Sequence, residues 1–371
     1  MDRPYRDLTP AQSYFCDALR FLAALAVALH HALHHVDFEP YKQFSQAYHA
    51  NLGWLGVAVF FLLSGFLIAH TAGRKANRGE YSFKTYFVER TVRIYLVYVP
   101  SIILAMITVA IFRGDLFQTP ETSLSMALTN LFMLQGLEPF SDHQETFFLL
   151  LPSWSLPYEY WFYMLFGLAT LPLSNRKSFS VIAGLLALIV AYLCMRLEFA
   201  LQYGALWAAG AATAYLFQRV RLRFAIALAI CVVAFAAAEL LRADASPQSG
   251  WLTNASLAVG FAAILFGLNL TTPLPARSLT SVLAGYSYSL YLTHTIWIYA
   301  FREMFSPQIE ALIGSLGRAA TAVVILIGVN FCAWLFALGT EAHNDSMRRW
   351  LLSGGKIAWR APGKGRLWFV R

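Results

Sequence analysis

The first apolar stretch of the chain carries side chains that could do chemistry inside a membrane. Residues 17–35, DALRFLAALAVALHHALHH, place Asp17 and Arg20 at the start and His31 eleven residues after Arg20. With about 3.6 residues per helical turn and a rise of about 1.5 Å per residue, His31 lies nearly above Arg20 and about 16 Å further along. Because charge is costly in hydrocarbon, we expect this stripe to face a protein interior.

His31 is the candidate general base. A neutral imidazole near the membrane midplane can take a proton from a hydroxyl and return it. Two alternatives stay open: a structural histidine bonded to a backbone carbonyl, and a histidine that acts as a covalent nucleophile. Asp17, three residues before Arg20, can pair with the guanidinium.

Four histidines lie at the end of this stretch, His30, His31, His34 and His35. They form two pairs at i, i+4, a spacing that can chelate a metal ion on a helix. His30, however, falls on a different face from His31. We therefore predict no metal site.

The composition is that of an integral membrane protein. The chain has 371 residues, of which 58% are hydrophobic and 13% charged, and its mean hydropathy is +0.54. The sequence contains several runs of 17 or more residues with almost no charge. Runs of this length predict an all-α, polytopic bundle of transmembrane helices. The net charge of +8 is the balance of 28 Lys and Arg residues against 20 Asp and Glu residues. The basic residues gather in particular loops and in the tail, a pattern that indicates membrane orientation rather than nucleic-acid binding.

Ten spans are predicted in all. Their ranges are 17–35, 53–72, 94–112, 154–173, 179–197, 200–217, 224–241, 251–270, 279–301 and 318–339. The basic loop 74–93 is assigned to the cytoplasm by the positive-inside rule, so both termini are cytoplasmic.

Two segments are assigned differently from the spans. Residues 82–93 predict a short amphipathic helix with Phe83, Tyr86 and Phe87 toward lipid. Residues 124–137 are expected to be re-entrant or interfacial, because a crossing there would put every later basic loop outside. Residues 1–345 form the predicted transmembrane domain, and residues 346–371 a basic cytoplasmic tail.

The order of several motifs resembles the acyltransferase 3 family of integral membrane acyltransferases. They are Arg20-x10-His31, GWLGVAVFFLLSGFLI in the second span, Arg90-Thr-Val-Arg93, PSWSLPYEYWFY at 152–163 and GYSYSLYLTHTIW at 285–297. One departure is Glu341-Ala-His343, where the family usually has Glu-x-Pro.

This resemblance implies transfer of an acyl group, commonly acetyl from acetyl-CoA, to a hydroxyl of a surface glycan or lipid-linked sugar. The expected location is a bacterial cytoplasmic (inner) membrane. The expected partners are acyl-CoA as co-substrate, the glycan acceptor and the lipid bilayer, with no nucleic acid and no metal.

Donor binding is assigned to arginines. Arg90 and Arg93, at i and i+3, would bind CoA phosphates, because guanidinium groups match phosphate oxygens; the alternative is contact with anionic lipid. Arg20 would bind the donor or orient His31 with Asp17, and its alternative is a snorkelling arginine that anchors the helix.

Further polar side chains are expected to line the site. Glu159, with Tyr163 four residues on, would orient His31 or the acceptor, or form a structural pair. Ser287, Tyr291 and His294 share one helical face at i, i+4 and i+7, which suits a site lining or interhelical hydrogen bonds. Trp154, at a predicted outer edge, could stack on a sugar.

Two other functions fit part of the pattern. A relative that acylates a cytoplasmic small molecule, such as a macrolide, would share every motif. A transporter or flippase would keep the intramembrane charges but would move its substrate without CoA.

Overall fold

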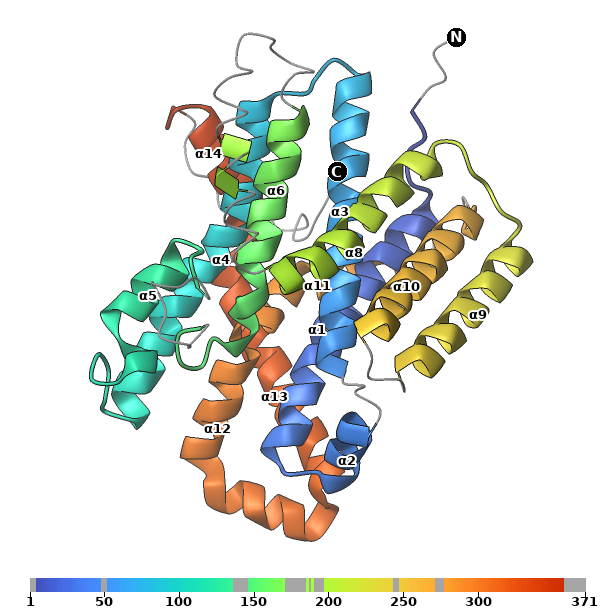
Figure 1. Cartoon of the computed structure of the whole chain (residues 1–371). Coiled ribbons are helices and arrows are strands. Elements are labelled where there is room, and N and C mark those ends of the chain that lie inside the picture. The colour runs from blue at the N-terminus through green and yellow to red at the C-terminus, as the bar shows by residue number, and fades with distance from the viewer. Residues whose placement is uncertain are drawn as a thin grey trace. The chain divides into compact units, whose positions relative to one another are not determined.

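A computed structural model describes residues 5–47, 52–135, 146–170, 185–186, 188–189, 197–242, 247–270 and 277–356, and within these ranges it contains helices and no strand. The chain forms two compact units. One comprises residues 1–23, 40–82 and 197–284, and the other residues 24–39, 83–196 and 285–371. Helix α1, Pro10–His35, begins in the first unit and ends in the second (Figure 1).

The remaining described helices of the first unit lie in it whole or in all but one residue. They are α2 Glu39–Ala47, α3 Leu52–Asn77, α8 Leu197–Phe217, α9 Phe224–Arg242, α10 Pro247–Gly267 and α11 Arg277–Gly285. Glycine permits the closest contact, because a Cβ atom on Gly65 of α3 would lie 1.9 Å from the Trp207 carbonyl oxygen of α8. Such close approach is typical of helices packed in membranes.

The N-terminal segment is tied to this unit by side-chain contacts. The Tyr5 hydroxyl donates to the His70 carbonyl oxygen at 2.9 Å. The Arg6 guanidinium donates to the Phe217 carbonyl oxygen at 2.9 Å and lies over the Phe217 ring. Asp7 accepts from Arg78 at 3.4 Å. These contacts fix the start of α1 against the ends of α3 and α8.

The second unit holds the helices that matter most for the site. They are α4 Phe83–Phe112, α5 Leu124–Leu131, α6 Leu156–Thr170, α12 Ser287–Leu316, α13 Arg318–Gly339 and α14 Asn344–Leu352, with short 3-10 turns at Pro120–Thr122, Leu151–Ser155 and Glu341–His343. Helix α12 packs against α13 and α4, while α6 and α14 also pack against α4. Helix α4 is therefore the common support of this unit.

Within the described residues, six helices are long and apolar enough to cross a membrane: α1, α3, α4, α9, α10 and α13. They contain the predicted spans 17–35, 53–72, 94–112, 224–241, 251–270 and 318–339, apart from the last three residues of 251–270, which follow α10. This confirms an all-helical membrane protein. The count of ten spans and the side of the membrane on which the termini lie stay predictions. Most of the predicted span 179–197 and the end of the predicted span 154–173 lie outside the described residues.

The structure differs from the prediction for residues 82–93 in two respects. The segment 82–93 is not a separate helix, because α4 runs without interruption from Phe83 to Phe112. Tyr86 does not face lipid either: it is buried, and its hydroxyl donates to the Tyr163 carbonyl oxygen at 2.9 Å. A tyrosine hydroxyl gains more from a protein carbonyl than from hydrocarbon, which has no acceptor.

The predicted span 279–301 is broken. Helix α11 ends at Gly285 and α12 begins at Ser287, with Tyr286 between them at φ −118° and ψ 8°. The Glu341 carboxylate accepts from the backbone N–H of Ser289 at 3.1 Å and from its hydroxyl at 2.9 Å. A carboxylate in this place satisfies free N–H groups of a helix start, which favours a new helix here.

In the described part of the segment 124–137, which is residues 124–135, the helix covers Leu124–Leu131. Eight residues rise about 12 Å, far short of the hydrocarbon thickness of about 30 Å. The segment therefore does not cross as a helix, and its re-entrant or interfacial position stays a prediction. Helix α14 runs across residue 345, the predicted domain boundary.

Candidate active site

The first three turns of α12 carry an unusual density of buried polar side chains. Ser287 and His294 are fully buried, and Tyr291 is nearly so, so the predicted i, i+4, i+7 face points into protein. The Tyr291 hydroxyl donates to the Pro152 carbonyl oxygen at 2.9 Å and lies 2.7 Å from the Ser155 hydroxyl. These bonds fix the turn Leu151–Ser155 against α12.

His31 and His294 lie next to each other. Their ring centroids are 5.1 Å apart, which places the last part of α1 beside α12 within the second unit. The His30 ring lies 5.0 Å from His31 and 4.5 Å from His34. The candidate base therefore belongs to a cluster of imidazoles, of which His294 is the most deeply buried.

Asp17 and Arg20 lie on the part of α1 that belongs to the first unit, whereas His31 belongs to the second. Helix α1 is unbroken from Pro10 to His35, so Arg20 and His31 keep the spacing of one continuous helix. Arg20 is 7% exposed, which is unusual for an arginine unless its charge is paired. The roles of Asp17 and Arg20 stay predictions.

Glu159 and Tyr163 interact directly on α6, where the Tyr163 hydroxyl donates to the Glu159 carboxylate. The charges of Glu159 and Arg93 also act on the hydroxyl of Tyr288, on α12. That hydroxyl is buried and has no hydrogen-bond partner within the described part of the chain. Tyr288 was not predicted, because it falls about 100° away from the face that Ser287, Tyr291 and His294 share.

A buried network centred on Asn130 was also missed. The Asn130 side-chain oxygen accepts from the Tyr98 hydroxyl at 3.2 Å and from the Ser153 hydroxyl at 3.3 Å, and Gln135 donates to the same Tyr98 hydroxyl at 3.2 Å. The network joins α4, α5 and the turn before α6. An asparagine and a glutamine inside an otherwise apolar segment were the available signal, since buried amides are rarely left unbonded.

Arg90 and Arg93 share α4 but have different surroundings. Arg90 lies 3.7 Å from the Glu89 carboxylate, which also accepts from Arg348 of α14 at 3.0 Å. Arg93 has no hydrogen bond or ion pair within the ranges that the structure describes, and it acts on the Tyr288 hydroxyl only through its charge. Arg93 is therefore the better placed of the two to receive an anionic ligand.

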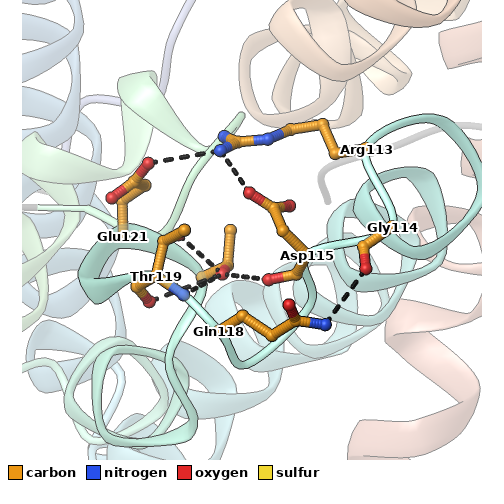
Figure 2. Close-up of polar contacts among 7 residues, drawn as sticks. Arg113, Gly114, Asp115, Gln118, Thr119 and Glu121 are labelled. Carbon is orange, nitrogen blue, oxygen red and sulfur yellow. Dashed lines mark hydrogen bonds and ion pairs between the residues drawn. The ribbon is translucent and has the colours of Figure 1, made fainter.

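The loop after α4 is held by a cluster of polar contacts (Figure 2). Arg113 lies 2.5 Å from the Asp115 carboxylate and 3.4 Å from that of Glu121, as Figure 2 shows. Its guanidinium also lies over the Phe148 ring, 4.2 Å from the ring centroid. The pKa of Glu121 lies below its ordinary value, first because its carboxylate accepts a hydrogen bond from the Glu121 backbone and then because of the Arg113 guanidinium.

The same loop reaches the histidine region through Phe148. The Phe148 backbone N–H donates to the Glu121 carbonyl oxygen at 2.9 Å, and the next carbonyl, that of Leu149, accepts from the Thr295 hydroxyl at 2.5 Å. Thr295 follows His294 directly. The loop therefore helps to fix the part of α12 that carries the candidate site.

Trp154 lies in the turn before α6, half-buried, with its ring 6.4 Å from Tyr158; its contact with a sugar stays a prediction. In the described ranges no group of three or more His, Cys, Asp or Glu residues could hold a metal ion.

Comparison with known proteins gives one match. A family model described as an acyltransferase domain covers residues 13–338, nearly the whole chain. No curated protein and no solved structure matches the chain. The matched range includes every candidate residue named above from Asp17 to His294.

Proposed function

The chain belongs to the acyltransferase 3 family, and from that premise we propose that it moves an acyl group, acetyl in the simplest case, from acyl-CoA to a hydroxyl of a surface or exported glycan. The expected setting is a bacterial cytoplasmic membrane, with both termini in the cytoplasm. The apolar helices and the family together support a membrane acyltransferase. The donor, the acceptor and the residue roles are the proposal.

The reaction requires a base, because a neutral hydroxyl is a weak nucleophile. His31 takes the hydroxyl proton while the oxygen attacks the thioester carbonyl carbon. The tetrahedral intermediate then collapses, the C–S bond breaks, and the imidazolium returns its proton to the departing thiolate, which leaves as free CoA. The balance is one acyl group transferred and one thiol formed.

The observation that carries this proposal is the position of His31, on the helix that also carries Arg20 and beside the buried ring of His294. An imidazole held among protein groups rather than in lipid suits proton transfer. Arg93, with Arg90 beside it, would bind the donor phosphates, and the Glu159–Tyr163 pair would orient the acceptor.

The test is acyl transfer by the His31→Ala variant. Membranes that contain the full chain are supplied with radiolabelled acetyl-CoA, and label in base-labile esters is counted. Loss of a general base lowers the rate by about 100-fold to 10,000-fold. His35→Ala, which removes an imidazole one turn further along α1 and outside the cluster of His30, His31, His34 and His294, is the matched control and keeps its activity. Wild-type transfer by His31→Ala would refute the proposal.

A further inference from the structure

His294 is the fully buried member of the histidine cluster, and both of its ring nitrogens can be assigned. Its Nδ1 atom lies 3.1 Å from the Leu290 carbonyl oxygen, one turn earlier on α12. A carbonyl oxygen only accepts hydrogen bonds, so Nδ1 must carry the proton of the neutral ring. The Nε2 atom is therefore the one with the lone pair.

That Nε2 atom is buried and has no hydrogen-bond partner in the part of the chain that the structure describes. Other buried polar groups nearby are bonded: Thr293 donates to the Ser289 carbonyl oxygen at 2.7 Å, and Thr295 to that of Leu149. Burial of an acceptor without a hydrogen-bond partner costs free energy, so an interaction that satisfies Nε2 is expected. The ring of His294 has the imidazole of His31 as a neighbour, with the two ring centroids 5.1 Å apart.

A general base works best when its second nitrogen is held by an acceptor, which fixes the tautomer and the direction of the ring. His31 has two nitrogens, and only one of them can receive the proton of the acylated hydroxyl. In unliganded enzymes such orienting hydrogen bonds are often long and shorten when substrate binds. A ring separation of 5.1 Å therefore suits this relation.

We propose that His294 is the positioning residue of His31: its Nε2 atom accepts a hydrogen bond from an N–H of His31 and turns the other nitrogen of His31 toward the hydroxyl that is acylated. This inference rests on the proposed function and adds a defined role for His294. The acceptor here is an imidazole on α12, whereas hydrolases with a Ser-His-Asp triad use a carboxylate as the acceptor.

Two substitutions separate this role from a structural one. His294→Asn keeps an N–H for the Leu290 carbonyl oxygen but has no acceptor where Nε2 lies. His294→Gln has a longer side chain, whose amide oxygen can reach the place of Nε2 and accept a hydrogen bond. Both variants are made in the full chain, and kcat and the KM for acetyl-CoA are measured in membranes with the radiolabel assay.

We expect His294→Asn to lower kcat by about 10-fold to 100-fold, the range found for residues that orient a metal-bound histidine, while the KM for acetyl-CoA stays unchanged. We expect His294→Gln to recover a large part of that loss. Thr293→Val is the control, because it removes a fully buried hydroxyl from the preceding position of α12 and leaves both histidines in place.

Equal and severe loss in both His294 variants would overturn the inference, since an orienting acceptor should be replaceable. Wild-type kcat in both variants would also overturn it. Neither result affects the proposed function as long as His31→Ala is inactive. If His31→Ala were active, the proposed function would fail as well, so the two failures are distinguishable.

Discussion

Arg90 and Arg93 lie one helical turn apart, yet their charges are balanced differently. Glu89 stands beside Arg90 and binds Arg348, so part of the charge of Arg90 is already compensated. Arg93 has no such partner in the described part of the chain. The two arginines, which the sequence pattern treats as equivalent, are therefore expected to contribute unequally to donor binding.

We predict that Arg93→Gln raises the KM for acetyl-CoA more than Arg90→Gln does. Loss of a hydrogen bond to a charged group costs about 1.5–3 kcal/mol, which corresponds to roughly 10-fold to 100-fold in KM. Lys84→Gln removes an exposed charge near the same end of α4 and is the control. The measurement is initial rate against acetyl-CoA concentration. A larger effect of Arg90→Gln would contradict the assignment.

At the scale of single elements, α12 depends on a residue far along the chain. Glu341, 8% exposed, accepts from the backbone and the hydroxyl of Ser289 near the start of α12. The helix start places Tyr291 and His294 one and two turns later. Glu341 is therefore expected to stabilise α12 and, through it, the position of His294.

We predict that Glu341→Gln lowers the free energy of unfolding by about 1–3 kcal/mol, because a charged acceptor of two hydrogen bonds becomes a neutral one. The loss is measured as a lower melting temperature of the purified protein in detergent. Asp345→Asn, which neutralises an exposed carboxylate four residues away, should change the melting temperature little. Equal shifts in both variants would argue against a cap of α12.

At the scale of the whole molecule, the predicted orientation places the start of α4 in the cytoplasm and the segment after it outside. Lys84 lies in the first turn of α4, and Leu124 is the first residue of α5, the next α-helix. Both side chains are exposed. We predict that an impermeant maleimide labels Leu124→Cys in intact cells and Lys84→Cys only in broken cells, with the native cysteines replaced. The opposite pattern would reverse the topology.

The sequence was sufficient to predict features that depend on residues close together in a single helix. Apolar length gave the six helices suited to a membrane, and helical periodicity put Ser287, Tyr291 and His294 on one buried face. Contacts between distant segments were not predictable in this way. The pairing of His31 with His294, the network of Asn130 and the cap of α12 by Glu341 all join residues whose separation carries no periodic signal.

The central claim is that the ring of His31 serves as the base for acyl transfer to a glycan. Its most direct test is mass spectrometry of surface glycans from a strain that lacks this gene, complemented with the wild-type chain or with His31→Ala at equal membrane levels. We predict that the wild-type chain restores one acyl mass and that His31→Ala does not. Restoration of that mass by His31→Ala would contradict the account.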